Sequence, residues 1–271
     1  MVIPVHDINP LRRTPWVTYA LIAANVVVFL LTPGNSTSVS GSMTVQDQCR
    51  QLKFYDHYAA IPKELTHNDP LNQVATGTAA REGNRVGCVV GKPTYEKVPF
   101  LSAITSQFLH GGWLHLLGNM LFLLIFGNNV EDRMGRVKFL VFYLLAGIIA
   151  AYGFALADPN SAQTLIGASG AIAGVLGAYL VMFPKARVWS LVPFLFFIPL
   201  RLPAWLVLGL WFVLQWAYAS GAAVSSAGNV AYLAHVVGFG FGVLVGLVVR
   251  RSTGPIYPQP AQRRRPAWRR R

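Results

Sequence analysis

Apolar stretches close to the length of a bilayer crossing dominate this chain and restrict what it can fold into. A transmembrane helix needs about 20 mostly apolar residues. Six stretches approach that length: Trp16–Thr32, Trp113–Asn128, Phe139–Ala157, Leu165–Phe183, Ala204–Ala219 and Val230–Val249. Only 12% of the 271 residues are charged, against roughly 25% in soluble domains. This composition excludes an ordinary soluble enzyme and a disordered chain, and it predicts an all-α membrane protein with six transmembrane helices.

The segments between these stretches divide the chain further. Residues 1–15 precede the six-span region 16–249, within which residues 33–111 form a long loop between the first two helices. The segment Val188–Leu200 is apolar, but it is too short to cross and contains Pro193 and Pro199. We expect it to be an in-plane or re-entrant segment. The first helix is predicted to be retained and not cleaved as a signal peptide, because no small-residue cleavage site clearly follows it.

The basic residues predict the orientation of the helices. Short loops rich in Lys and Arg face the cytoplasm. Such clusters lie at residues 12–13, 133–138, 185–187 and 250–251, whereas the short loops Asp158–Thr164 and Ser220–Asn229 on the other side lack both, and the basic residues of the long loop count for little. Both termini are therefore expected to be cytoplasmic, in the plasma membrane, with residues 33–111 outside. The net charge of +13 reflects this topology and not nucleic-acid binding. The basic tail 250–271 is suited to contact anionic lipids of the inner leaflet.

Two cysteines, Cys49 and Cys88, lie in the long outer loop. The outer side is the oxidising side, which favours a disulfide between them. Two unpaired thiols remain the alternative, because the sequence does not report the distance between their Cα atoms.

A few polar residues interrupt the apolar stretches, and polar residues in membrane helices are functional candidates. His110, His115 and Asn119 lie near the start of the second helix, Ser169 near the start of the fourth and His235 early in the sixth. At a rise of 1.5 Å per residue, Asn119, Ser169 and His235 each lie roughly 6–9 Å inside the outer end. Three helices thus carry an amide, a hydroxyl and an imidazole at one depth.

Glycines make a contact between these helices plausible. Gly238, Gly242 and Gly246 share the face of His235, and Gly170 and Gly174 follow Ser169. Small residues at this spacing allow close approach of membrane helices. The plainer interpretation is that they serve packing alone, but such packing would itself bring Ser169 and His235 together.

This set of residues predicts a serine nucleophile activated by a histidine base. Asn119 and His115 are suited to stabilise a developing oxyanion. No acidic residue lies within a predicted helix, so a Ser-His dyad is expected and not a triad. The three histidines could bind a metal in principle, but there is no H-E-x-x-H motif and nothing requires one.

At these motifs the sequence resembles the rhomboid family of intramembrane serine proteases, of the bacterial type. The motifs are the GxSG of Gly167–Gly170, the HxxxxHxxxN of His110–Asn119 and the AHxxG of Ala234–Gly238. The resemblance implies Ser169 as nucleophile, His235 as general base, and His115 and Asn119 as oxyanion-stabilising side chains. It also implies motif or structural roles for a further set: His110, Gly167, Gly170, Gly238, and the ExRxG element of Glu131, Arg133 and Gly135.

The implied activity is endoproteolysis of single-span membrane proteins, within or beside their transmembrane segment near the outer face, without a cofactor. The family's Trp-Arg pair before the first motif histidine is absent, because Leu101 and Ser102 occupy these positions. Two alternatives remain. One is a non-proteolytic relative that binds membrane clients, and the other is a small transporter or channel, which the apolar inner halves of the helices disfavour.

Overall fold

A bundle of apolar helices forms most of the computed structural model, which describes residues 3–9, 11–35, 43–83, 85–192, 198–220 and 231–253. The protein is predominantly helical. The bundle consists of α1 (Trp16–Leu31), α5 (Trp113–Phe122), α6 (Asn128–Met134), α7 (Arg136–Ala157), α8 (Ser169–Met182), α9 (Ala204–Ala219) and α10 (Tyr232–Thr253). The short segment η3 (Leu123–Gly127) is a π-helical turn that joins α5 and α6 into one continuous helix.

Three helical stretches in the described residues are long and apolar enough to cross a membrane. They are Trp113–Met134, Arg136–Ala157 and Tyr232–Ser252. Three shorter apolar helices accompany them, namely Trp16–Leu31, Ser169–Met182 and Ala204–Ala219. A protein with transmembrane helices was predicted from the apolar stretches, and these helices agree with that prediction.

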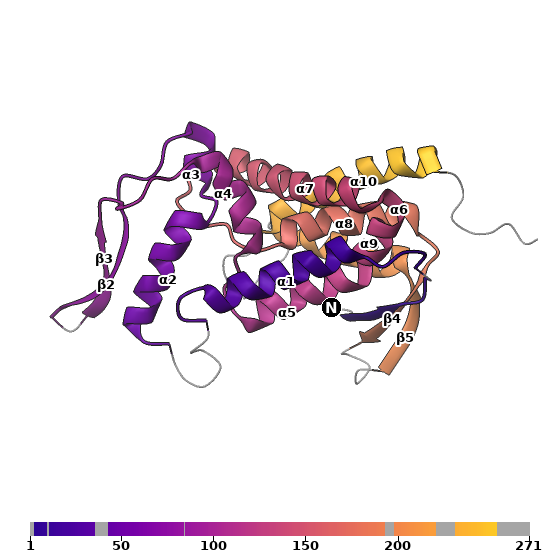
Figure 1. The fold of residues 1–271 in the computed structure, drawn as a ribbon, viewed down its shortest axis with the longest axis horizontal. Helices are drawn as coiled ribbons and strands as arrows, with labels where there is room; N and C mark the ends of the chain where they lie inside the picture. The colour runs from indigo at the N-terminus through magenta and orange to yellow at the C-terminus, as the bar shows by residue number, and fades with distance from the viewer. Residues whose placement is uncertain are drawn as a thin grey trace, which may run out of the picture.

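Helix α8 lies at the centre of the bundle and is buried on nearly all sides. It packs most extensively against α10, and α7 covers another side of it (Figure 1). The contact with α10 depends on glycine. A Cβ added to Gly242 would overlap the carbonyl oxygen of Gly174, and one added to Gly177 would overlap the carbonyl oxygen of Phe239. The backbones of α8 and α10 therefore touch directly, as small residues allow in membrane helices.

A strand near the N-terminus and two strands that follow α8 form a sheet that was not predicted from the sequence. Strands β1 (Ile3–Asp7), β4 (Arg187–Val192) and β5 (Ile198–Pro203) pair antiparallel in the order β1-β4-β5. The expected in-plane or re-entrant segment is thus a pair of strands, and the fold is not all-α. Residues 193–197, with Pro193, lie outside the described residues. Proline lacks a donor and is confined to edge strands, which fits Pro199 and Pro203 in the edge strand β5.

Buried polar contacts tie β1 to the bundle. The Tyr179 hydroxyl on α8 donates a hydrogen bond to Asp7 Oδ2 at 2.5 Å, and Asn129 Nδ2 donates to the same oxygen at 2.7 Å. The backbone N–H of Asn9 donates to Asp7 Oδ1 at 3.0 Å. Burial nevertheless raises the pKa of Asp7, against the lowering effect of the hydrogen bonds from Tyr179 and Asn9. We call this end of the bundle the sheet end.

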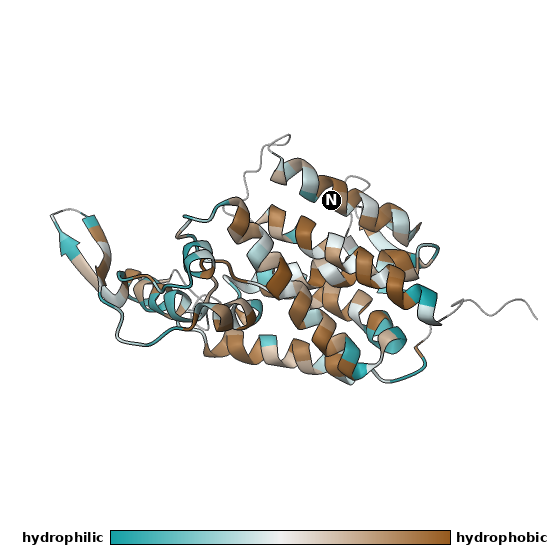
Figure 2. Ribbon diagram, turned by 90° about the horizontal axis from the view of Figure 1, so that it is seen from above, coloured by the Kyte–Doolittle hydropathy of each residue, from teal (hydrophilic) through white to brown (hydrophobic). Residues whose placement is uncertain are grey.

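The segment expected as the long outer loop holds several elements of its own. Helix α2 (Val45–Tyr58), α3 (Pro62–His67), β2 (Val74–Glu82) and β3 (Arg85–Gly91) form the part that we call the disulfide unit. Helix α4 (Pro99–Thr105) and the short helix η2 (Ser106–Phe108) lead back to the bundle. Figure 1 shows α2, β2 and β3 at the end of the molecule opposite β4 and β5. In Figure 2 the bundle is mostly hydrophobic, whereas hydrophilic residues gather on the projecting hairpin.

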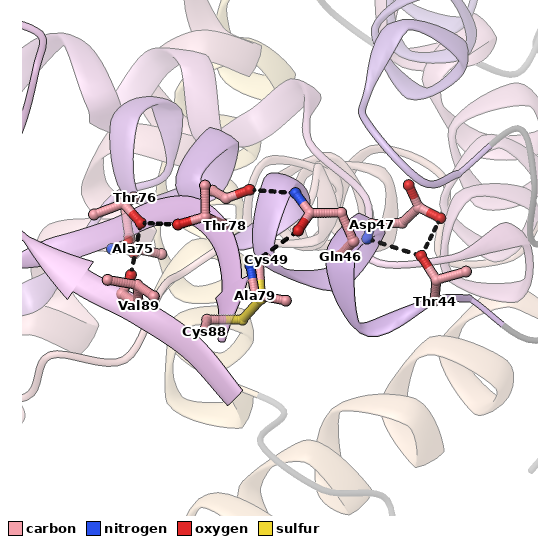
Figure 3. Close-up of a disulfide and its surroundings, with 12 residues drawn as sticks. Thr44, Gln46, Asp47, Cys49, Ala75, Thr76, Thr78, Ala79, Cys88 and Val89 are labelled. Atoms are coloured by element: carbon pink, nitrogen blue, oxygen red, sulfur yellow. Dashed lines mark hydrogen bonds between the residues drawn. A yellow bond between two sulfur atoms is a disulfide. The ribbon is translucent and has the colours of Figure 1, made fainter. Parts of the chain in front are cut away.

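A disulfide holds the two layers of this unit together. Cys49 on α2 is bonded to Cys88 on β3, with a Cα–Cα distance of 5.2 Å (Figure 3). Gln46 strengthens the same contact, because its Nε2 donates to the Gly77 carbonyl at 2.8 Å and its Oε1 accepts from the Ala79 N–H at 2.9 Å. The hairpin is therefore fixed to α2 by both covalent and hydrogen bonds.

A buried ion pair lies where this unit meets the chain leading to α4. Lys97 Nζ is 2.5 Å from Glu64 Oε2, and both side chains are almost fully buried. Lys97 Nζ also donates to the carbonyls of Asp56 and Ala59 at 2.7 and 2.9 Å. Burial lowers the pKa of Lys97, and the contact with Glu64 opposes that shift. The ion pair therefore has the additional hydrogen bonds that a buried charge requires.

Candidate active site

The start of α8 and the first half of α10 bring a serine and a histidine into contact. Ser169 is the first residue of α8 and is half-buried, and His235 lies one turn into α10 with 9% of its surface exposed. Ser169 Oγ lies 2.8 Å from His235 Nε2. This is hydrogen-bonding distance. The two residues assigned from the sequence as nucleophile and base are thus neighbours in the structure.

The glycines of the two motifs account for this proximity. A Cβ added to Gly238 would overlap the carbonyl oxygen of Gly170, the residue that follows Ser169. A Cβ on Gly170 would lie 2.7 Å from the Ala150 side chain on α7. A larger residue at Gly238 would separate α10 from α8 at the level of the Ser-His contact, and a larger residue at Gly170 would push α8 away from α7. The packing and the contact are therefore consequences of the same close approach.

A residue from α9 contacts the other side of the His235 ring. Gln215 Oε1 lies 2.7 Å from His235 Nδ1, and Gln215 is 7% exposed. Gln215 is not among the site residues predicted from the sequence. The sequence did contain a signal for it: Gln215 is the one amide in the apolar helix Ala204–Ala219. A buried amide needs a hydrogen-bond partner, so this residue could have been selected as a candidate.

Asn119, His110 and His115 form a group beside the loop that leads into Ser169. Asn119 Nδ2 donates a hydrogen bond to His110 Nε2 at 2.9 Å, and both residues are buried. The exposed His115 stacks edge-on to His110, with ring centroids 5.0 Å apart. The three residues that the motif spacing grouped together are therefore in contact through His110.

Gly167 brings the Ser169 loop against these side chains. Its φ of +120° is in the region that favours glycine. A Cβ at this position would lie 2.7 Å from His115 Nε2 and 3.7 Å from Asn119 Nδ2. The loop is held there by a hydrogen bond from the Gly167 N–H to the Ser106 carbonyl at 2.9 Å. His115 and Asn119 thus lie beside the backbone that leads directly into Ser169.

The ExRxG element lies in α6, at the other end of the continuous helix that carries His115 and Asn119. The carboxylate of Glu131 is buried and accepts hydrogen bonds from the backbone N–H groups of Val17 and Thr18, at 3.0 and 2.7 Å, and from the Thr18 hydroxyl at 2.7 Å. These are first-turn N–H groups of α1, which lack partners within a helix. Gly135, with φ +83°, forms the corner between α6 and α7. Glu131 and Gly135, like Arg133 between them, lie in or next to α6, away from Ser169.

Among the described residues, no group of three or more His, Cys, Asp or Glu side chains could hold a metal ion. Helices α5, α7, α8, α9 and α10 contain no Asp or Glu at all. The chemistry available around Ser169 in this part of the chain is therefore that of hydroxyl, imidazole and amide groups.

Comparison with known proteins identifies the family of the chain. The family model described as Rhomboid domain matches residues 99–252, which is more than half of the chain and includes Ser169, His235, Asn119 and Gln215. The chain belongs to the rhomboid family. The disulfide unit lies before the matched residues, and so do β1 and α1.

Individual rhomboid relatives match over regions of different length. RHOMBOID-like protein 6 of Arabidopsis thaliana is 27% identical over 201 residues, covering 70% of this chain and 60% of the relative. Rhomboid protein 1 of Saccharomyces cerevisiae is 32% identical over 157 residues, covering 56% of this chain and 42% of the relative. Presenilin-associated rhomboid-like protein A of Danio rerio is 34% identical over 94 residues, covering 34% and 24%. The chain thus spans less than two thirds of the length of these rhomboid proteins.

These comparisons correct the predicted location. All three relatives are named as mitochondrial proteins, which points to a mitochondrial membrane and not the plasma membrane. The prediction of a plasma-membrane rhomboid was therefore wrong. Lys and Arg asymmetry reports which way helices cross a bilayer, but it does not report which membrane they enter.

Proposed function

We propose that this protein is an intramembrane serine endopeptidase that uses Ser169 and His235 to cleave membrane-protein substrates. The 2.8 Å distance from Ser169 Oγ to His235 Nε2, in a member of the rhomboid family, carries the proposal. Rhomboid proteins are generally intramembrane serine proteases, although some members are inactive. This chain keeps both the hydroxyl and the imidazole, at hydrogen-bonding distance.

The first half of the reaction uses the serine as nucleophile. Ser169 Oγ attacks the scissile carbonyl carbon while His235 Nε2 takes its proton, because serine is a weak nucleophile until a base removes that proton. The resulting tetrahedral oxyanion collapses when the C–N bond breaks. The imidazolium of His235 gives its proton to the leaving amine, and the new amino terminus departs from the ester formed on Ser169.

Water completes the cycle in the second half. His235 removes a proton from a water molecule, which attacks the ester carbonyl and forms a second tetrahedral oxyanion. The imidazolium then returns the proton to Ser169 Oγ, and the new carboxyl terminus is released. Water must reach a half-buried serine, and Ser169 at the very start of α8 is suited to meet it. No cofactor takes part.

Asn119 and His115 are proposed to stabilise the oxyanion together with the first backbone N–H groups of α8. The Asn119 amide carries two N–H donors, of which one is directed at His110 Nε2. N–H groups in the first turn of a helix lack partners within that helix. Donors arranged before the charge develops stabilise the transition state more than the substrate.

We infer that all six apolar helices cross the membrane. Helices α1, α8 and α9 have 16, 14 and 16 residues, which is short for a crossing helix. Helix α8 is enclosed by other helices, so its ends need not reach the lipid headgroups. The site then lies near the face that carries the disulfide unit, as the Tyr55 and Asn35 contacts with His110 support.

The proposed substrates are single-span membrane proteins, cut within or beside their transmembrane segment. A helix must open before its peptide bond can reach Ser169, and its freed backbone groups then need new partners. Arg250 and Arg251, together with the rest of the basic tail in the sequence, are proposed to contact anionic lipids.

The test compares wild type, Ser169→Ala and His235→Ala in liposomes that contain a panel of single-span substrates. Wild type should cleave near one end of the substrate helix, as mapped by mass spectrometry, and should react with a fluorophosphonate probe. Each variant should lose at least about 10³-fold in kcat while it unfolds at the wild-type temperature. Cleavage by Ser169→Ala at the wild-type rate would contradict the proposal, and a folded wild type without cleavage or labelling would favour client binding.

A further inference from the structure

We propose that Gln215 is the positioning residue of the base: its Oε1 accepts a hydrogen bond from His235 Nδ1 and so directs the lone pair of Nε2 toward Ser169. The inference rests on the proposed function, and it turns the expected dyad into a chain of three residues, Gln215–His235–Ser169. Gln215 does not contact the reacting atoms. It acts through His235.

The geometry places the two contacts of His235 on its two ring nitrogens. Gln215 Oε1 is 2.7 Å from Nδ1, and Ser169 Oγ is 2.8 Å from Nε2. A neutral imidazole carries one proton, and the hydrogen bond made by one nitrogen decides which of the two holds it. A carbonyl oxygen is only an acceptor. The proton therefore belongs on Nδ1, and Nε2 is free to accept the proton of Ser169.

Burial strengthens the preference of this hydrogen bond for one tautomer of His235. Gln215 and His235 are 7% and 9% exposed, so little water competes for either nitrogen. In free histidine both neutral tautomers are populated, and only the one with an unprotonated Nε2 can act as base toward Ser169. An unpaired polar group in such surroundings is costly, which disfavours any arrangement that breaks the contact.

Aromatic rings restrict the remaining freedom of the imidazole. Trp211 lies one turn before Gln215 on α9, with its ring centroid 6.0 Å from that of His235. Tyr232 lies one turn before His235 on α10 and meets its ring edge-on at 6.4 Å. Tyr218 of α9 stacks on Tyr232 at 4.8 Å. Helix α9 thus presents Trp211, Gln215 and Tyr218 to the segment that carries the base.

An amide suits this position better than the carboxylate of a Ser-His-Asp triad. Helices α5, α7, α8, α9 and α10 contain no Asp or Glu, and an ionised carboxylate in their apolar surroundings would be costly. Gln215 supplies the orienting acceptor without a charge. It does not provide the electrostatic stabilisation that a carboxylate gives to the imidazolium, so its contribution is orientation.

A merely structural role for Gln215, tying α9 to α10, is the competing explanation. The first measurement therefore reads the tautomer without any reaction. Full-length protein labelled with ¹⁵N-histidine is studied by NMR in micelles, and the His235 signals are assigned with His235→Ala. The expected spectrum has a protonated Nδ1 and an unprotonated Nε2 in wild type, and a mixture of both tautomers in Gln215→Met. A proton on Nε2 in wild type would overturn the proposal.

The second measurement is kinetic and uses matched variants on one helix. Gln215→Met keeps the length of the side chain but removes the acceptor, and Leu214→Met makes a similar change on the exposed side of α9. Gln215→Met should lower kcat by about 10- to 100-fold with KM unchanged, which is less than the complete loss of a general base can cost. Leu214→Met should match wild type. A folded Gln215→Met with wild-type kcat would overturn the proposal.

Rescue by a conservative change separates orientation from packing. Gln215→Glu keeps an acceptor oxygen at the same reach, so above neutral pH its kcat should exceed that of Gln215→Met. Equal losses in the two variants would assign Gln215 to packing alone. The tautomer measurement does not depend on proteolysis, so it stands even if wild type cleaves no substrate, and a failure of the proposed function is distinguishable from a failure of this inference.

Discussion

The Tyr55 hydroxyl donates a hydrogen bond to the backbone carbonyl of His110 at 3.0 Å. Asn35 Nδ2 contacts the same carbonyl at 3.4 Å, and Gln51 on α2 donates to Asn35 Oδ1 at 2.9 Å. Burial raises the pKa of Tyr55 to about 12, so its hydroxyl remains a donor at neutral pH. Helix α2 of the disulfide unit is therefore connected to His110, whose side chain accepts the hydrogen bond from Asn119.

Removing this hydroxyl should disturb the site and not only the outer unit. In Tyr55→Phe the carbonyl loses its shorter bond, which is worth about 1 kcal/mol of unfolding free energy. We expect kcat to fall by up to about 10-fold as His110 and Asn119 become less restrained. The control is Tyr58→Phe, an exposed residue on the same helix. Equal kcat for the two variants and wild type would show that the connection does not reach the site.

Truncation of Asn119 tests the proposed oxyanion donors. Asn119→Ala should lower kcat by about 10²-fold, since one such donor typically contributes that much. KM should change little, because the interaction strengthens only as the oxyanion forms. Leu117→Ala, an exposed position on the same helix, serves as the control. The measurement is steady-state cleavage of a substrate in liposomes, and an unchanged kcat in Asn119→Ala would exclude this role.

The glycine contact between α8 and α10 predicts an unusually large effect of one methyl group. Gly242→Ala would place its Cβ on the Gly174 carbonyl, and forcing the helices apart should cost about 1–3 kcal/mol or more. Activity should fall together with stability, because the same shift separates Ser169 from His235. Thermal unfolding and probe labelling measure the two effects.

Gly240 offers a matched control on the same helix. A Cβ at Gly240 meets nothing within 4 Å. Gly240→Ala should therefore leave activity unchanged and stabilise the helix by up to about 1 kcal/mol. If Gly242→Ala behaved like Gly240→Ala, the direct contact of the two backbones would be refuted.

The raised pKa of Asp7 predicts a dependence of stability on pH. A carboxyl group whose folded pKa lies above its unfolded value stabilises the protein fully below the unfolded pKa, near 3.8. That contribution is lost as the pH rises through the folded pKa. Asp7→Asn lacks this titration, so wild type should lose stability relative to the variant between acidic and neutral pH. Thermal unfolding of both proteins across this range measures the difference, and parallel curves would contradict the pKa direction.

Much of the bundle was predictable, because its helices are long apolar stretches of sequence. Few structures other than membrane helices accommodate such stretches. The pairing of Ser169 with His235 was predictable for a related reason. Polar residues stand out in apolar helices, and the glycine spacing marks the face on which helices approach. Gln215 was not predictable in its role, since the rotation of α9 relative to α10 is set by packing that the sequence does not display.

The three-stranded sheet could not be read from local pattern. Strand β1 pairs with a strand that lies some 180 residues later, as the pairing of Ile3 with Leu191 shows. Periodicity reports which residues share a face, but it does not report which distant segment will pair. Pro193 and Pro199 contributed to the expectation of an in-plane or re-entrant segment, although an edge strand accepts a proline such as Pro199 equally well.

The π-helical turn η3 changes the angle about the helix axis between the side chains that precede it and those that follow it. Asn119 and Glu131 are 12 residues apart, which in an uninterrupted α-helix corresponds to about 120° of rotation between them. One π turn takes up about one extra residue, which reduces that angle to about 20°. The wide turn therefore lets a single helix present the oxyanion amide at one end and the cap of α1 at the other on nearly the same side. A regular α-helix with the same number of residues between Leu123 and Gly127 would turn one of these two side chains away from its partner, whereas deletion of one residue there would remove the wide turn and keep their relative direction.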